Sequence, residues 1–306
     1  MEQTAQDILR LNPDVLVTID APGFCLRLAA RVRAAFKGKI VHYVAPSVWA
    51  WKPGRAAKMA PNVDHVLALL PFEPPYMTKA GMSCDFVGHP VAAELTPDKS
   101  AIKAFRDELS LGDDKLITLL PGSRVGEITR LAPIFFEVAK NLGQGYRFVI
   151  PVAAKHLVEP LEALLKQAGL EATLLLPETG VKTTAFAASE LALAASGTVS
   201  IELAAVGTPM VIGYKTNWLT GQIMRRAMLA PSFTLVNLLT NSKSVPEFHS
   251  ERCTVETLTN AMQELLQNPA TRSAQIKIGE QAITALGRGG EDPGLRAARS
   301  VLSVIQ

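Results

Sequence analysis

LALAASGTVSIELAAVGTPMVIGYK, residues 191–215, is the stretch from which the fold can be worked out. Residues 191–195 form a short apolar run, and Ser196-Gly197-Thr198 is small and typical of a turn. Residues 199–206 have helical character until Gly207-Thr208-Pro209 ends the helix, and residues 210–214 have the pattern of a buried strand. A strand, a helix and a second strand within so few residues predict a right-handed crossover between parallel strands. The turn at 196–198 then lies at the carboxyl end of the first strand.

This turn has the features of an anion site. Unpaired backbone N–H groups and the positive end of the helix favour a phosphate, and Gly197 permits close approach because it has no Cβ. Glu202 lies one turn into the helix, where a carboxylate needs donors, and the vicinal hydroxyls of a ribose would supply them. The alternative is an ordinary crossover helix with Glu202 in solvent.

Length, charge and cysteine content narrow the class of protein. A chain of 306 residues is long enough for two domains, and a net charge of +3 is too small to indicate nucleic acid, although it is compatible with contact at an anionic membrane. Three widely spaced cysteines, with no Cys/His cluster, predict a reducing cytosolic setting and no metal. We expect neither a membrane span nor an export signal.

The first half begins with a helical pattern over 2–11 and an apolar run over 15–19 that ends at Asp20. In a doubly wound sheet the carboxyl edge faces the ligand crevice, so Asp20 is a candidate catalytic base. The alternative is that Asp20 caps the helix predicted over 24–36.

Further strands are expected over 39–45, 65–70 and 84–87. Trp49 and Trp51 share one loop, where packing onto the sheet is expected for at least one of them and ligand stacking is the other option. His89, in a turn, is either a donor to a phosphate or sugar oxygen or a structural residue.

A lapse in the apolar pattern over 92–98 predicts a boundary between domains 1–95 and 96–306. In the second domain a strand over 116–120 ends in Pro121-Gly122-Ser123-Arg124, and Arg124 could neutralise a diphosphate by a forked pair of hydrogen bonds. The alternative is that Arg124 pairs with Glu127 on the helix surface. The remaining expected elements are strands over 146–152, 172–176, 191–195, 210–214 and 233–237, and helices over 254–306 with a break at 287–290.

Residues 216–229 carry Trp218, Leu219, Ile223 and Met224 beside Arg225 and Arg226. Such a segment could touch a membrane, a lipid substrate or a partner subunit, or it could pack in the core.

Strand ends at Arg124, at 196–198 and at Asn237 should converge on one sheet edge, with Asp20 facing them from the other half. This arrangement suits a nucleotide diphosphate on the second domain and an acceptor on the first. The sequence has no Gly-x-Gly-x-x-Gly, P-loop or Asp-x-Asp pattern, which argues against nicotinamide oxidoreductases, nucleoside triphosphatases and a metal-held diphosphate.

Several blocks in this order and spacing resemble the lipid-A-disaccharide synthase family over nearly the whole chain. They are TIDAPGF (18–24), HYVAPSVWAWKPGR (42–55), LPFE (70–73), VGHP (87–90), LLPGSRVGEI (119–128), ASGTVSIELAAVGTPMVIGYK (195–215) and LVNLL (235–239). The resemblance implies an α/β protein of the GT-B class, with two Rossmann-like domains facing across a cleft. It also implies an inverting glycosyltransferase that joins UDP-2,3-diacylglucosamine to 2,3-diacylglucosamine 1-phosphate and releases UDP, with no metal or cofactor.

The resemblance assigns roles to individual residues. Asp20 would take the proton from the acceptor's 6-hydroxyl, and Arg124, beside Ser123, would hold the diphosphate. The other donor-binding residues would be Ser196, Gly197, Thr198, Glu202 and Asn237. The family resemblance also implies a cytoplasmic enzyme at the inner leaflet of the inner membrane, with a homodimer as an option and no nucleic-acid partner.

The chain departs from the family pattern at its start, because it begins at the helix before TIDAPGF. We therefore expect an incomplete N-terminal domain that lacks the first strand and its Gly-Glu-x-Ser-Gly-Asp loop and exposes a sheet edge. Two other readings follow: a UDP-binding remnant without turnover, or another GT-B enzyme or epimerase that uses a UDP-sugar. The APSVWAW block argues against both another GT-B enzyme and an epimerase.

Overall fold

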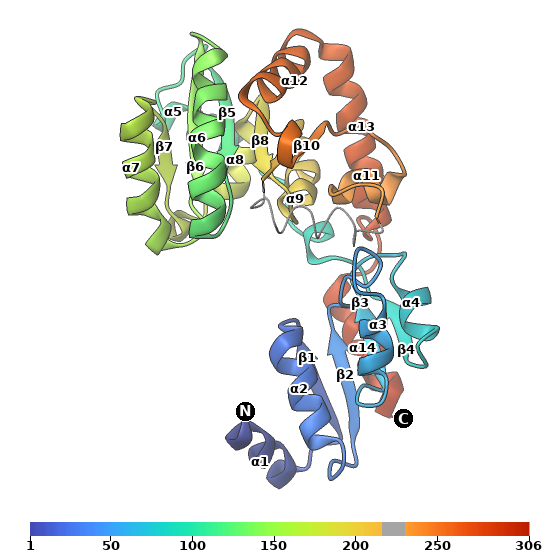
Figure 1. The fold of residues 1–306 in the computed structure, drawn as a ribbon. Helices are drawn as coiled ribbons and strands as arrows, with labels where there is room; N and C mark the ends of the chain where they lie inside the picture. Colours follow the sequence, from blue (N-terminus) through green and yellow to red (C-terminus); the bar gives the residue numbers. More distant parts are fainter. Residues whose placement is uncertain (216–229, 306) are drawn as a thin grey trace. The chain divides into compact units, whose positions relative to one another are not determined.

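Ten strands form two separate parallel sheets in a computed structural model that describes residues 1–215 and 230–305. The described residues divide into two units (Figure 1). The first unit contains residues 1–93, 230 and 284–305, and the second contains residues 94–215 and 231–283. The segment predicted over 216–229 lies outside the described residues.

The first unit is a four-stranded sheet in the order β1-β2-β3-β4. The central strands β2 and β3 are short and largely buried, as expected where both faces of a parallel sheet are covered, whereas the edge strands β1 and β4 are partly exposed. Helices α1, α2 and α4 contribute to the core on one face, and α14 packs on the other. The elements are α1 Glu2–Leu11, β1 Val15–Ile19, α2 Pro22–Val32, β2 Lys39–Tyr43, α3 Gly54–Met59, β3 His65–Ala68, α4 Pro74–Thr78, β4 Ser83–Phe86, the 3-10 turn Pro90–Ala92 and α14 Pro293–Ile305.

The C-terminal helix α14 is fixed to this unit by polar contacts. Ser300 Oγ donates to Asp85 Oδ2 at 2.6 Å and lies 2.7 Å from His65 Nε2, while Arg296 donates to the Phe86 carbonyl. Burial lowers the pKa of His65, although the nearby Asp85 carboxylate opposes the shift. The sequence-based boundary placed 96–306 in one domain, and the structure corrects it because residues after 283 belong with the first unit.

The second unit has six parallel strands in the order β10-β9-β8-β5-β6-β7. Its main core lies beneath α6, α7 and α12, and a smaller cluster packs under α5 and α8. The elements are α5 Lys99–Glu108, β5 Lys115–Leu120, α6 Val125–Asn141, β6 Tyr146–Pro151, the 3-10 turn Lys155–Leu157, α7 Val158–Ala168, β7 Thr173–Leu175, the 3-10 turn Pro177–Thr179, α8 Lys182–Ala188, β8 Leu191–Ala195, α9 Val199–Ala205, β9 Met210–Tyr214, α11 Leu235–Thr240, β10 Glu247–His249, the 3-10 turn Ser250–Arg252, α12 Val255–Gln267 and α13 Pro269–Ala285.

Two expectations about the second unit are wrong. Residues 233–237 are not a strand, because residues 235–240 form α11. The last strand is β10, which pairs in parallel with β9 in a region where no strand was expected. The strands predicted over 191–195 and 210–214 are confirmed as β8 and β9. In the described part of the chain, no helix combines the length and apolar character that a membrane span requires.

Candidate functional site

The candidate site lies where the strand order of the second unit reverses. Strands β5 and β8 are parallel neighbours there, although they are far apart in sequence. Their carboxyl ends lead into residues 122–124 and 196–198, which line a pocket of about 650 Å³ together with residues 175–177, Gly180, Lys182, Thr183 and Glu202. Such a switch point is the usual ligand crevice of open α/β sheets, and the volume lies within the range of small-molecule sites. Two of the three predicted strand ends are therefore brought together.

Arg124 is the residue immediately before α6, and its side chain is 80% exposed. Its Nη1 donates to Glu127 Oε1 at 2.9 Å, so the ion pair considered as an alternative is present. The other carboxylate oxygen of Glu127 accepts the Ser123 N–H at 3.0 Å. The first turn of α6 thus already holds an anion, which is supplied by the helix itself.

Glu202 also has a cationic partner in the pocket. Lys182 Nζ donates to Glu202 Oε2 at 2.6 Å, and both side chains line the cavity. The sequence left two alternatives for Glu202: a carboxylate in solvent, or a carboxylate that needs ligand hydroxyls as donors. In the structure Lys182 already supplies a donor to it. Sequence reasoning missed Lys182, because a lysine that opens a helix is usually a surface residue. The sequence signal that could have identified Lys182 was its position directly after the loop that follows β7.

Ser196 and Gly197 form the β8 side of the pocket. Ser196 Oγ donates to the Phe233 carbonyl at 3.0 Å, which uses its proton and leaves only lone pairs for a ligand. Among the residues that the structure describes, none comes within 4 Å of the position that a Cβ on Gly197 would take, so the described backbone leaves this point open to the cavity. Thr198 precedes α9 and makes no side-chain capping bond.

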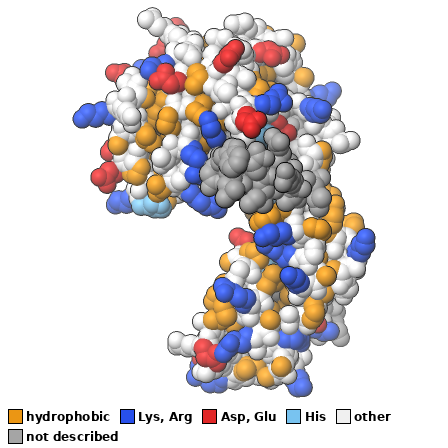
Figure 2. Space-filling view, viewed as in Figure 1, with side chains coloured by type: hydrophobic (Ala, Val, Ile, Leu, Met, Phe, Trp, Pro, Cys, Tyr) orange, Lys and Arg blue, Asp and Glu red, His pale blue; other side chains and the backbone are white. Residues whose placement is uncertain are grey.

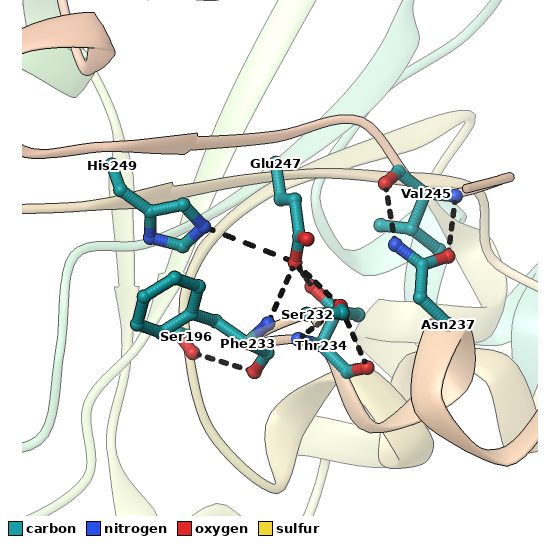
Figure 3. Close-up of polar contacts among 8 residues, drawn as sticks. All are labelled: Ser196, Ser232, Phe233, Thr234, Asn237, Val245, Glu247 and His249. Carbon is teal, nitrogen blue, oxygen red and sulfur yellow. Dashed lines mark hydrogen bonds and ion pairs between the residues drawn. The ribbon is translucent and has the colours of Figure 1, made fainter. Parts of the chain in front are cut away.

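A polar network around Glu247 fixes the loop that carries Phe233 (Figure 3). Glu247 Oε2 accepts hydrogen bonds from Ser232 Oγ, the Phe233 N–H and Thr234 Oγ1, at 2.9, 3.1 and 2.8 Å. His249 Nε2 lies 3.9 Å away, and its ring packs against that of Phe233. Burial by itself raises the pKa of the Glu247 carboxyl, but His249 and the hydroxyl donors outweigh burial and lower it. The carboxylate therefore holds the loop against Ser196.

Asn237 does not line the pocket, and it lies within α11 rather than at a strand end. Its amide is 2% exposed and forms two hydrogen bonds with one residue: Nδ2 donates to the Val245 carbonyl at 2.9 Å, and Oδ1 accepts the Val245 N–H at 3.0 Å (Figure 3). This geometry ties α11 to the segment before β10. A role of Asn237 in donor binding stays a prediction.

Asp20 follows β1 in the first unit and is exposed. Its N–H donates to the Tyr43 carbonyl, and both Asp20 and Ala21 adopt positive φ, at 46° and 41°. The residue that precedes α2 is Ala21 and no side chain caps that helix, so the capping alternative for Asp20 is wrong. Two successive non-glycine residues in the left-handed region cost about 1 kcal/mol or more each, and such strain is concentrated at functional sites.

His42 is a second titratable residue near this strand end, and sequence reasoning missed it. Its ring is fully buried on β2, with Nδ1 2.8 Å from Thr18 Oγ1. Within residues 1–215 and 230–305, Nε2 has no hydrogen-bond partner. Burial lowers the pKa of His42, and the nearby Asp20 opposes the shift.

The two tryptophans of the first unit differ. Trp49 Nε1 donates to the buried Glu73 at 3.1 Å and its ring meets Phe72 edge-on, so this side chain packs the loop as predicted. Trp51 is 42% exposed. His89 Nδ1 accepts the Val91 N–H at 3.1 Å, which is the structural role. The described residues contain no group of three or more His, Cys, Asp or Glu that could hold a metal ion.

Solved structures with this fold include one in complex with UDP-glucose and one in complex with UDP. The chain aligns with Anabaena HepE, solved in complex with UDP-glucose, at a TM-score of 0.63 and 13% identity, over 99% of this chain and 81% of that one. It aligns with S. aureus MnaA, solved with UDP, at a TM-score of 0.66 and 14% identity, over 98% and 77% of the two chains. At this identity the likeness establishes the fold alone, which is that of the GT-B class.

Comparison of sequences adds a family to this fold. The family model described as lipid-A-disaccharide synthetase matches residues 1–293. The lipid-A-disaccharide synthase of Ruegeria pomeroyi is 48% identical over 98% of this chain and 76% of its own length. That of Rhodospirillum centenum is 40% identical over 100% of this chain and 77% of its own length. The chain therefore belongs to the lipid-A-disaccharide synthase family, the glycosyltransferases of lipid A biosynthesis.

Proposed function

We propose that the chain transfers 2,3-diacylglucosamine from UDP to the 6-hydroxyl of 2,3-diacylglucosamine 1-phosphate, with inversion, and releases UDP. Family membership supports this reaction. The observation that carries the proposal is the pocket at the β5–β8 switch point, which Arg124 and Lys182 line with positive charge.

The UDP part of the donor would occupy this pocket. HepE and MnaA, which share the fold, were solved with UDP-glucose and UDP. In this chain Arg124 and Lys182 would neutralise the diphosphate, because guanidinium and ammonium groups both bind phosphate oxygens. Ser123 and residues 196–198 would offer backbone N–H groups, and Glu202 would accept hydrogen bonds from the ribose hydroxyls.

Asp20 would act as the general base. Its carboxylate takes the proton of the 6-hydroxyl while that oxygen forms a bond to the anomeric carbon. The bond from this carbon to the diphosphate oxygen breaks at the same time, and its electron pair leaves with UDP. One in-line displacement inverts the anomeric configuration. The strained, exposed and non-capping position of Asp20 supports this role.

The test combines turnover with binding. The chain is incubated with both diacylated sugars, disaccharide and UDP are detected by mass spectrometry, and UDP affinity is measured by calorimetry. Asp20→Asn should abolish turnover and leave UDP affinity unchanged, whereas the control Asp14→Asn, at an exposed carboxyl before the same strand, should alter neither. UDP binding by the unmodified chain without any product would refute the proposed reaction. A loss of UDP affinity in Asp20→Asn would instead refute the role of Asp20.

We also propose a cytoplasmic, peripheral position at the inner membrane, because both substrates carry acyl chains. The first unit exposes Phe24 and Trp51, each 42% accessible, and Lys52 Nζ lies 4.3 Å from the centre of the Trp51 ring system. Hydrophobic and basic side chains are interspersed on the face seen in Figure 2. Sedimentation with anionic and neutral vesicles tests this: retention by anionic vesicles is expected, and no retention would refute it. A homodimer stays a prediction, which sedimentation velocity can test.

A further inference from the structure

Glu127 occupies the donors that an anionic ligand would need at the start of α6. One carboxylate oxygen accepts the Ser123 N–H at 3.0 Å, and the other accepts from Arg124 at 2.9 Å. The Glu127 side chain is only 17% exposed, while that of Arg124 is 80% exposed. The carboxylate is therefore seated within the pocket, and the guanidinium can reach outward from it.

Gly122 shows how closely Glu127 is seated over the loop. A Cβ at position 122 would lie 2.5 Å from the Cβ of Glu127 and 2.8 Å from its Oε2, and Gly122 has a φ of +130°. Both features restrict this position to glycine. The loop and the carboxylate are thus fitted closely to each other.

A diphosphate would need the same two donors. Backbone N–H groups at a helix start and a forked guanidinium are the usual partners of phosphate oxygens. A carboxylate left beside a bound diphosphate would repel it, because both are negative and lie in a partly enclosed site. Glu127 and the diphosphate therefore compete for the Ser123 N–H and for the positive charge of Arg124.

We propose that Glu127 is a built-in competitor of the donor's diphosphate and so sets how tightly the pocket holds the nucleotide. This inference rests on the proposed function, because it takes the pocket to be the UDP site. When the diphosphate binds, the Glu127 carboxylate gives up Ser123 and Arg124. When UDP leaves, the carboxylate returns to them. Uridine has no phosphate and should bind without displacing Glu127.

Calorimetry with UDP and with uridine on four proteins tests this role. Glu127→Gln and Glu127→Ala should each bind UDP about fivefold more tightly than the wild type, because a competing ion pair worth up to about 1 kcal/mol is removed. Their uridine affinity should not change. The matched control is Glu137→Gln, on the same helix, where Glu137 pairs with Lys140 at 2.9 Å outside the pocket. This control should bind both ligands like the wild type.

The outcomes separate the two proposals. Equal or weaker UDP binding by both Glu127 variants, when the wild type binds UDP, would overturn the competitor role and leave the proposed function standing. A rise in uridine affinity equal to that in UDP affinity would also overturn it, because the effect would not depend on phosphate. If neither the wild type nor the variants bind UDP, the assignment of the pocket as the donor site fails, and the role of Glu127 fails with it.

Discussion

Glu73 is a buried carboxyl group that should govern how the stability of the first unit depends on pH. It is 3% exposed and accepts three hydrogen bonds, from Trp49 Nε1 at 3.1 Å and from the Leu69 and Leu70 N–H groups at 3.1 and 3.0 Å. Burial raises its pKa from the ordinary 4.5 to about 7, although these donors act in the opposite direction. The folded protein therefore binds a proton that the unfolded chain has released.

The sign and size of the effect follow from this difference. Between pH 4.5 and 7 the folded state holds the proton on Glu73, so its contribution to stability is present at acid pH and is lost as the pH rises through 7. A rise in pKa from 4.5 to about 7 corresponds to about 3 kcal/mol, since a tenfold change in proton affinity is worth about 1.4 kcal/mol. Most of this stabilisation, about 2.5 kcal/mol, is lost as the pH rises from 5 to 8.

Glu73→Gln removes the titration and keeps the size of the side chain. Urea unfolding of the wild type and the variant, followed by tryptophan fluorescence at several pH values from 5 to 8, gives the free energy of unfolding. The difference, wild type minus variant, should fall by about 2–3 kcal/mol as the pH rises over this range. Trp49 bonds directly to Glu73, so the probe reports on the right unit. Asp14→Asn, at an exposed carboxyl before β1, is the control and should leave the pH slope unchanged.

The opposite slope would refute this reasoning. If the three donors kept Glu73 ionised in the folded protein, its pKa would lie at or below the ordinary 4.5, and any loss of stability would come below pH 5. A difference that stays flat or rises between pH 5 and pH 8 would therefore show that folding does not raise the pKa of Glu73. Either result would mean that burial does not dominate at this site.

Two further substitutions test polar contacts between distant segments. Asn237→Asp should destabilise the second unit by about 2–4 kcal/mol, because an oxygen replaces the amide donor that faces the Val245 carbonyl. Urea unfolding followed by circular dichroism measures this, and an unchanged free energy would contradict it. Ser300→Ala should cost about 1–3 kcal/mol, because it removes the bridge between His65 and Asp85. The rate of amide hydrogen exchange in α14 should rise. Unchanged protection would show that the apolar face of α14 is enough to hold the helix on the sheet.

The strands of the buried sheets were predictable because their signal is local. Residues 191–195 and 210–214 are continuous apolar runs bounded by turn residues, which is how a strand covered on both faces appears in sequence. The pocket loop at 196–198 followed from the first of these runs, and the loop at 121–124 followed from the apolar run over 116–120. The same reasoning failed at 233–237, where an apolar, β-branched pattern gave a strand but the structure has a helix. Glu247 and Val245 bind this segment from farther along the chain, and local pattern cannot report such contacts.

The partners of the site residues were the least predictable part. The sequence placed Arg124 and Glu202 in the pocket, but it could not say which groups they contact before a ligand arrives. Lys182 comes from a helix twenty residues before Glu202, and only the fold brings their side chains within 2.6 Å. Likewise, α14 joins the first unit through contacts across more than two hundred residues. Such pairings depend on topology, which residue spacing alone does not determine.

Under the proposed function, the ion pairs of the pocket bear on turnover as well as on binding. The diphosphate of free UDP carries one more negative charge than that of the sugar nucleotide, so two bare cations would hold the product more tightly than the donor. Slow product release would then limit the rate. Arg124 and Lys182 are instead paired with Glu127 and Glu202, at 2.9 and 2.6 Å. A carboxylate that returns to these donors as UDP departs opposes this product retention. Where release limits the rate, Glu127→Gln should therefore lower kcat while it tightens UDP binding.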